Sequence, residues 1–255
     1  MIRSDRDVVL VTGAAGAIGS ATVRRFLDAE FEVVGLDRDA AVLDVRHAGY
    51  TAFQVDIAEE RSLGETVERA QGIGRLAHVI GVAGGALPDE VRVEGRPEQL
   101  SVDSFRASVE ANLTTQFLMF RAVLPWLERD GTIDRSITFT SSFNALSGWG
   151  LPAYAAAKAG LIGLMQNLAP PLGARGIRVN VVAPGTVRTP RTERNWRNVP
   201  GHFERLEKMS ALGKLARPDD VAAAFFAVAV VLTHVTGQVL VVDGGQSVTR
   251  VSPVP

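Results

Sequence analysis

Short apolar segments alternate along the chain with longer segments whose apolar residues return every three or four positions. The short segments have the length of buried strands, and the longer ones have the period of amphipathic helices. The pattern predicts strands near residues 8–12, 31–36, 50–55, 77–83, 134–140, 177–183 and 238–242, and helices near residues 17–29, 39–48, 59–71, 102–128, 152–174 and 218–231. This alternation predicts an α/β fold, doubly wound, with a seven-stranded, mostly parallel sheet and helices on both faces.

Two longer segments, about 84–100 and about 185–215, show no clear period. Each follows a predicted strand, and open α/β sheets bind ligands beyond the carboxyl ends of their strands. We therefore expect a substrate loop in the first segment and a lid over substrate in the second. No linker or repeat divides the 255 residues, so we expect a single domain over residues 1–255.

A glycine-rich turn lies between the first predicted strand and the first predicted helix. Gly13 permits a tight turn, and Gly16 and Gly19 let the backbone approach a ligand and let the helix pack on the strand. A strand, a glycine turn and a helix in this order place a pyrophosphate on backbone N–H groups. The spacing is G-x-x-x-G-x-G, and an ordinary strand–helix turn is the alternative interpretation.

Asp37 follows the second predicted strand, about 20 residues after the glycines. A carboxylate there accepts hydrogen bonds from the adenosine ribose hydroxyls and repels a 2′-phosphate. The turn itself holds Ala14 and Ala15 and no basic residue, which favours NAD over NADP. Arg38 keeps NADP as an alternative, and an N-cap of the next helix is the other role open to Asp37.

Tyr154 and Lys158 are four residues apart in Tyr154-Ala-Ala-Ala-Lys158 and follow the pair Ser141-Ser142. Positions i and i+4 share one face of a helix. A free phenol titrates near pH ~10, and an adjacent cation favours the phenolate. The pair is therefore a candidate proton donor and acceptor near neutral pH, with a surface pair on a helix as the alternative.

In this order the motifs resemble those of the short-chain dehydrogenases/reductases, in their shorter, single-domain form. The resemblance extends from about residue 8 to about residue 248. It implies a Rossmann-like fold and an oxidoreductase that interconverts a secondary alcohol and a ketone with a nicotinamide cofactor. Further matching positions are Asp56-Ile57, Asn112, Arg178-Val179-Asn180, residues 184–189, Thr236-Gly237 and residues 242–245.

The resemblance also implies catalytic roles. Tyr154 exchanges a proton with the substrate oxygen, Lys158 holds the nicotinamide ribose, and Asn112 holds a water behind the lysine. Physically, Lys158 together with the nicotinamide cation of NAD⁺ would lower the phenol pKa. A serine hydrogen-bonds the reacting oxygen, and Ser142 is the preferred candidate when the motif is aligned from the strand. Ser141 matches when it is aligned from Tyr154, and only one of two neighbouring strand residues can face the substrate.

The family's cofactor-binding positions lie at strand ends and in the loops that follow them. Val187 would pack on the nicotinamide face, and Thr189 would hydrogen-bond its carboxamide. The full set that the resemblance implies is Gly13, Gly16, Ile18, Gly19, Asp37, Asp56, Ile57, Ala83, Gly84, Tyr154, Lys158, Pro184, Gly185, Val187 and Thr189.

The chain departs from the family pattern in two places. Residues 81–84 read Gly-Val-Ala-Gly where the family has Asn-Asn-Ala-Gly, so we expect lower local stability there without loss of cofactor. Pro170 and Pro171 fall inside the long predicted helix that carries Tyr154, and we expect them to kink it or end it early.

Composition and charge narrow the class of protein. A net charge of −1 without a basic block argues against nucleic acid or an anionic membrane as partner. The longest apolar run, residues 221–232, is too short to span a bilayer, and the N-terminus lacks a signal-peptide pattern, so we expect a cytoplasmic protein. The absence of cysteine excludes thiol catalysis, and the scattered histidines lack metal-ligand spacing.

The sequence predicts only the chemical class of the substrate and a general oligomeric state. Phe143, Leu146, Trp149, Leu151 and Trp196 favour an apolar or aromatic ketone or secondary alcohol. Arg188, Arg191 and Arg194 offer a carboxylate or phosphopantetheine site, with a solvated lid face as the alternative. A 3-oxoacyl-thioester reductase and a non-catalytic NAD-binding regulator are the competing functions. The all-round apolar run 225–232 predicts burial and, by the resemblance, a homotetramer.

Overall fold

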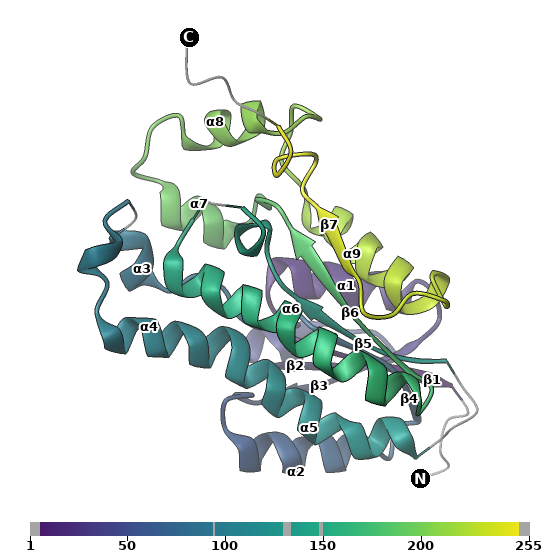
Figure 1. Cartoon of the computed structure of the whole chain (residues 1–255). Coiled ribbons are helices and arrows are strands. Elements are labelled where there is room, and N and C mark those ends of the chain that lie inside the picture. The colour runs from purple at the N-terminus through teal and green to yellow at the C-terminus, as the bar shows by residue number, and fades with distance from the viewer. Residues whose placement is uncertain (1–5, 94, 130–133, 148–149, 250–255) are drawn as a thin grey trace.

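The computed structural model describes residues 6–93, 95–129, 134–147 and 150–249. Its seven strands form one sheet in the order β3-β2-β1-β4-β5-β6-β7, and each neighbouring pair is parallel (Figure 1). The predicted doubly wound α/β fold is confirmed. The strands are β1 (Asp7–Thr12), β2 (Glu32–Asp37), β3 (Tyr50–Gln54), β4 (Arg75–Gly81), β5 (Arg135–Thr140), β6 (Ile177–Pro184) and β7 (Val239–Val242).

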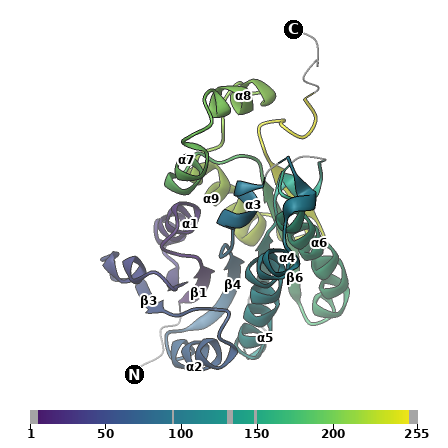
Figure 2. The same cartoon turned by 90° about the vertical axis from the view of Figure 1, so that its left-hand side faces the viewer.

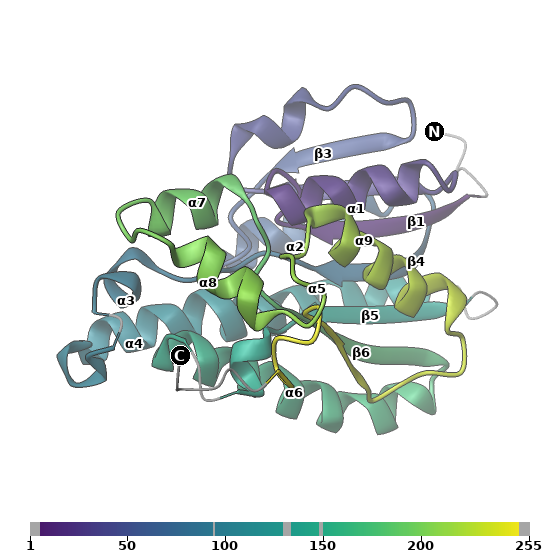
Figure 3. The same cartoon turned by 90° about the horizontal axis from the view of Figure 1, so that it is seen from above.

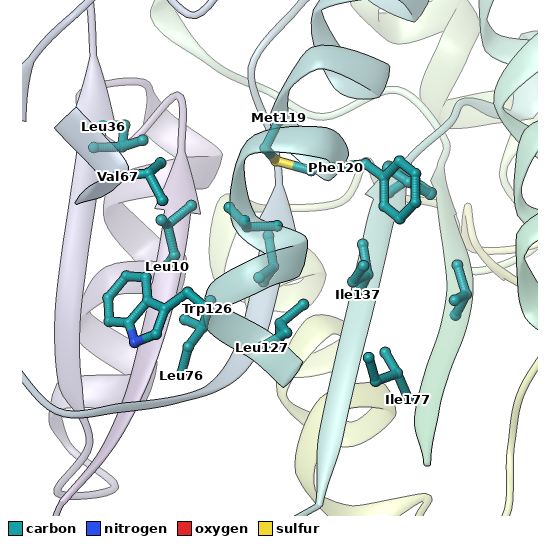
Figure 4. Close-up of a cluster of buried hydrophobic side chains, with 14 of the residues drawn as sticks. Leu10, Leu36, Val67, Leu76, Met119, Phe120, Trp126, Leu127, Ile137 and Ile177 are labelled. Atoms are coloured by element: carbon teal, nitrogen blue, oxygen red, sulfur yellow. The ribbon is translucent and has the colours of Figure 1, made fainter. Parts of the chain in front are cut away.

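Two separate apolar clusters, one on each face of the sheet, form the core. On one face, the strands pack against α2 (Glu60–Ala70), α5 (Thr115–Glu128) and α6 (Pro152–Gly173). Figure 4 shows part of this cluster around Trp126, whose indole Nε1 donates to the Gly74 carbonyl at 3.2 Å. On the other face lie α1 (Ala17–Leu27), the 3₁₀ helix η1 (Ala40–Asp44) and α9 (Pro218–Phe226). The central strands are buried on both sides, which explains their continuous apolar sequences.

The predicted helix over 102–128 is interrupted by a wider turn. α4 (Val102–Val109) passes through the π-helical turn η3 (Glu110–Thr114) into α5. A second π-helical turn, η5 (Ala227–Val231), extends α9. The predicted helix over 39–48 is reduced to η1, whose first turn is capped by the Asp39 side chain.

The two segments without periodicity contain short helices. The first holds α3 (Pro88–Arg92) and the 3₁₀ helix η2 (Pro97–Gln99), and the second holds α7 (Pro190–Trp196) and α8 (His202–Met209). Helices of one or two turns provide too few repeats for periodicity to reveal them. In Figures 1 and 3, α3, α7 and α8 lie together beyond one end of the sheet, and Figure 2 faces that end.

Pro170 and Pro171 do not end α6 early, because the helix continues to Gly173, and the kink that was the other expectation stays a prediction. The carbonyl partners that these prolines cannot bond belong to Gln166 and Asn167, which are both exposed. Water can therefore satisfy those carbonyls, and the prolines sit in the last turn, where few helical bonds remain to be lost.

The apolar run after α9 is buried on one side only. Val228 and Ala229 belong to the core, whereas Val231 is 62% exposed. Leu240 and Val241 of β7 are 36% and 37% exposed. Within the described part of the chain, no helix is both long and apolar enough to cross a membrane.

Candidate active site

The glycine turn lies at the carboxyl edge of the sheet, where the strand order reverses between β1 and β4. Gly13 has φ +68°, and a Cβ there would lie 2.8 Å from the Ala83 nitrogen. A Cβ on Gly19 would collide with the Gly13 carbonyl. Within the described chain, α1 begins after Gly16 without a side-chain cap, so its N-terminal N–H groups suit a phosphate. These residues therefore fit a dinucleotide.

Asp37 supports the glycine turn from the end of β2. Its carboxylate accepts hydrogen bonds from the backbone N–H groups of Ala15 and Asp39, each at 2.9 Å. Asp39, and not Asp37, caps the following helix by accepting from the Ala41 N–H at 3.0 Å. The N-cap interpretation of Asp37 is thus wrong, and its carboxylate lies beside the turn.

Lys158 is the buried cation of the candidate site. Its side chain is 2% exposed, and its Nζ donates to the Thr140 carbonyl at 2.8 Å. The same Nζ lies 5.5 Å from the centre of the Tyr154 ring. Burial, together with the positive charge of the nearby Arg191, lowers the pKa of Lys158 to about 7. The ammonium is therefore able to release its proton near neutral pH.

The two serines at the end of β5 face opposite ways, as alternation along a strand requires. Ser141 Oγ donates to the Lys158 carbonyl at 2.7 Å and is buried against α6. The Ser142 hydroxyl hydrogen-bonds the Tyr154 side chain, and its Oγ accepts from the Asn144 N–H at 3.2 Å. Ser142 is thus the serine that the structure brings to the tyrosine.

Burial and three neighbouring side chains act on the pKa of Tyr154. Burial raises the pKa of the phenol, and the carboxylate of Glu90 adds to that rise. The hydrogen bond from Ser142 and the charge of Arg191 act in the opposite direction. In the chain without cofactor, desolvation dominates and holds the proton on the phenol. The prediction that Lys158 and the nicotinamide cation of NAD⁺ together lower this pKa stays a prediction.

Asn112 lies in the π-helical turn and binds the substrate loop. Its Oδ1 accepts from the Gly85 N–H at 2.7 Å, and its Nδ2 donates to the carbonyls of Gly85 at 3.1 Å and Ser108 at 3.0 Å. A Cβ on Gly84 would lie 2.7 Å from Asn112 Oδ1 and 3.4 Å from Lys158 Nζ. Asn112 and Lys158 therefore meet at Gly84, and a π turn at a functional position is a recurrent arrangement.

Three side chains brace the end of β4, where the family asparagines are missing. Gln116 Nε2 donates to the Ala83 carbonyl at 2.7 Å, and Thr140 Oγ1 donates to the Gly81 carbonyl at 2.6 Å. Thr12 Oγ1 accepts from the Ala83 N–H at 3.3 Å. The Gln116 side chain occupies the space that a Cβ on Gly81 would need. The lower stability expected at this strand end stays a prediction.

The remaining cofactor candidates lie along the same edge. Asp56 is exposed and accepts from the Ala58 N–H at 3.0 Å, while Ile57 is buried. Thr189 caps α7, and its Oγ1 accepts from the Thr192 N–H at 3.2 Å. Ile18 is partly buried on α1, and Pro184 is at the end of β6. Gly185 packs tightly against Asp243, and the buried Val187 pairs with Ala216.

Glu90 is a functional candidate that sequence reasoning missed. The side chain, on α3, is 1% exposed. Its Oε1 accepts from the Tyr154 N–H at 2.9 Å, and its Oε2 accepts from Ser108 Oγ at 2.6 Å. A carboxylate at a helix N-terminus is stabilised by the helix dipole. Glu90 therefore ties the segment 84–100 to the helix that carries Tyr154, a contact that no local sequence pattern indicates.

The lid segment is held by contacts within itself and with the substrate loop. Trp196 of α7 stacks on His202 of α8, with ring centres 4.6 Å apart. Arg188 pairs with Glu207 at 3.3 Å and covers the Phe203 ring. Arg191 Nη1 donates to the Gly84 carbonyl at 2.6 Å.

The apolar residues proposed to line the substrate site differ in how exposed their side chains are. Phe143 and Leu151 are buried, and Leu146 is exposed. Trp149 lies outside the described residues. In the described ranges, no group of three or more His, Cys, Asp or Glu side chains is arranged to hold a metal ion.

The fold, the family model and the relatives together define an oxidoreductase that acts on CH–OH groups with a nicotinamide cofactor. A family model described as enoyl-(acyl carrier protein) reductase matches residues 13–247. The chain is 35% identical over 247 residues to an uncharacterized oxidoreductase of Schizosaccharomyces pombe, covering 93% of this chain and 90% of that protein. It is 32% identical over 256 residues to the 3-oxoacyl-(acyl-carrier-protein) reductase of Thermotoga maritima, covering 96% and 99%.

A solved structure agrees with these relatives. The crystal structure of an oxidoreductase of the short-chain dehydrogenase/reductase family from Burkholderia thailandensis superposes with a TM-score of 0.84 at 36% identity. The match covers 95% of this chain and 93% of that chain. The chain therefore belongs to the short-chain dehydrogenase/reductase family.

Proposed function

We propose that this protein is an NAD(H)-dependent oxidoreductase that interconverts a secondary alcohol and a ketone with an apolar or aromatic body. The observation that carries the proposal is the Ser142–Tyr154 hydrogen bond beside the buried Lys158. All three lie at the sheet edge that holds the glycine turn. Residues 1–255 act as one domain, with a substrate loop at about 84–100 and a lid at about 185–215.

The side chains divide the proton chemistry between them. A bound reduced nicotinamide supplies the hydride. Tyr154 keeps its proton at neutral pH because burial raises its pKa, so it is ready to donate to a carbonyl oxygen. Ser142 then stabilises the phenolate by a charge-assisted hydrogen bond. Lys158, with a pKa of about 7, can return a proton to the phenolate, and Asn112 holds the backbone beside it.

The cofactor preference rests on Asp37. Its carboxylate lies beside the glycine turn, where the adenosine ribose binds in such folds. A negative charge there repels a 2′-phosphate and leaves hydroxyls as acceptable partners. Asp37→Ala should therefore raise the ratio of kcat/KM for NADPH to that for NADH by at least about tenfold, which corresponds to about 1.4 kcal/mol. An unchanged ratio would remove Asp37 as the discriminator and leave Arg38.

The test of the function is the initial rate of NADH and NADPH consumption against aromatic, aliphatic, cyclic and 3-oxoacyl ketones. Tyr154→Phe should lose activity by about 10³-fold or more, because it removes the general acid. The chain has two tyrosines, so Tyr50→Phe is the matched control and should keep activity within about twofold. Loss of activity in both variants, or in neither, contradicts the assignment of Tyr154.

The same panel separates two competing functions. A 3-oxoacyl-thioester reductase is favoured by the 32% identical relative from Thermotoga maritima and would prefer the 3-oxoacyl substrate. A non-catalytic regulator would bind NADH and reduce no ketone. The even charge balance, with a net charge of −1, gives no strong sign of a basic surface for an acidic carrier protein, and this favours a free ketone.

We also propose a cytoplasmic homotetramer that acts on a small molecule and binds neither nucleic acid nor membrane. Val231, Leu240 and Val241 expose apolar surface near the end of the chain. A second copy of the chain would cover it, since contiguous exposed apolar surface marks interaction sites.

A further inference from the structure

Arg191 directs a cation from the lid toward the catalytic pair. Its Nη1 donates to the Gly84 carbonyl, and its guanidinium occupies the space that a Cβ on Gly85 would need. Gly84 in turn lies against Lys158, because a Cβ there would approach Nζ to 3.4 Å. The guanidinium is therefore placed over the substrate loop at the catalytic end of the sheet.

The three lid arginines differ in their partners. Arg188 is neutralised by Glu207 and packs on Phe203. Arg194 is exposed and makes none of the hydrogen bonds or ion pairs found among the described residues. Arg191 reaches the site but pairs with no carboxylate in the described part of the chain. A guanidinium carries five N–H donors, and the Gly84 carbonyl takes one of them.

Charges around the catalytic pair favour an anion. Arg191 lowers the pKa of both Tyr154 and Lys158, which shows that its charge reaches both groups. Glu90 is the carboxylate that acts on Tyr154, and its two oxygens already accept hydrogen bonds from Tyr154 N–H and Ser108. Arg191 therefore keeps free donors and no counter-ion beside the reacting groups.

We propose that Arg191 is a substrate-carboxylate subsite, so that the preferred substrate is a ketone or secondary alcohol with an apolar body and a carboxylate at its far end. This inference rests on the proposed function and names its substrate class. The fork of the guanidinium matches a carboxylate through two parallel hydrogen bonds. The cofactor diphosphate has its own candidate site at the N-terminus of α1, around Gly13 and Gly16. Arg191 binds the Gly84 carbonyl instead, and its charge acts on Lys158 and Tyr154.

The test compares acids with their methyl esters, which differ in charge and little in shape. The probes are 4-oxocyclohexanecarboxylate and 4-oxo-4-phenylbutanoate, each with its methyl ester, and NADH as the reductant. Wild-type enzyme should favour the acids in kcat/KM by about 30-fold, the value of one charge-assisted interaction. Arg191→Gln should lower kcat/KM for the acids far more than for the esters and so remove most of that preference, and Arg191→Lys should restore part of it.

Arg194→Gln is the matched control, because it removes an arginine from the same lid helix and should leave the preference intact. Equal use of acid and ester by the wild type would overturn the inference while leaving the proposed function in place. The inference would also be overturned if Arg191→Gln raised the KM for NADH equally with acid and ester and left the preference for acids unchanged. That result would assign Arg191 to the cofactor diphosphate. Failure of the wild type to reduce any ketone would overturn the proposed function itself.

Discussion

Replacement of Lys158 by methionine should change how stability depends on pH. The lysine is almost fully buried, and its charged form has the Thr140 carbonyl as its one hydrogen-bond acceptor among the described residues. Its pKa falls from an ordinary 10.5 to about 7 in the folded chain. Between these values the unfolded chain binds a proton that the folded chain releases, so the free energy of unfolding rises with pH.

The magnitude follows from the two pKa values. Integrating the difference in bound protons between pH 7 and pH 9 gives about 2 kcal/mol for a side chain with these pKa values. The wild type should therefore lose about 2 kcal/mol more stability than Lys158→Met when the pH falls from 9 to 7. The sign is opposite to that of a lysine stabilised by an ion pair.

The assay is urea unfolding without cofactor, followed by circular dichroism at one protein concentration and several pH values. Lys214→Met controls for the removal of a lysine, because Lys214 is exposed. A constant difference between wild type and Lys158→Met from pH 7 to pH 9 would refute the reasoning. It would mean that Lys158 keeps an ordinary pKa and is not poised to exchange a proton at neutral pH.

Three further predictions concern the hydrogen bonds of the site and the exposed apolar surface. Ser142→Ala should lower kcat by about 10- to 100-fold in steady-state assays, because a hydrogen bond to a charged group is worth ~1.5–3 kcal/mol. Ser141→Ala should instead lower the free energy of unfolding by about 1 kcal/mol and lower kcat by less than about threefold. Equal losses of kcat would contradict the opposite facing of the two serines. Glu90→Gln keeps the shape of the side chain but removes the charge that raises the Tyr154 pKa. The basic limb of the kcat/KM–pH profile for ketone reduction should therefore move to lower pH. If that limb does not move, Glu90 has only a structural role. Val231→Asp should shift the protein to smaller species in light scattering. Val102→Asp, which changes a similarly exposed valine, should not. Identical masses for both variants would exclude Val231 from the interface between subunits.

Much of the fold is predictable because the central strands are continuous apolar runs. Both ends of each of the seven strands lie within two residues of their predicted positions. The short helices were missed because α3, α7 and α8 contain one or two turns, too few for periodicity to show. The π turn at residues 110–114 was missed because it changes the helical period over a single turn, which is too short for the sequence pattern to show.

The candidate site is predictable where its chemistry lies in a local motif. Tyr154 and Lys158 are one helical turn apart, and Ser141 and Ser142 adjoin a strand end, so spacing alone relates them. Glu90 contacts the Tyr154 N–H across 64 positions of the chain, a distance over which spacing gives no information. The rise of the Tyr154 pKa in the chain without cofactor could not be predicted for a related reason, because burial is a property of the whole fold.

The most direct test of the central claim is the fate of the hydride. Ketone reduction with NADH deuterated at nicotinamide C4, in both the pro-R and the pro-S form, is followed by mass spectrometry of the product alcohol. The account predicts one deuterium on the carbinol carbon from one of the two forms, and no product above background with Tyr154→Phe. An alcohol without deuterium from either form, or equal product from Tyr154→Phe, would contradict hydride transfer assisted by Tyr154.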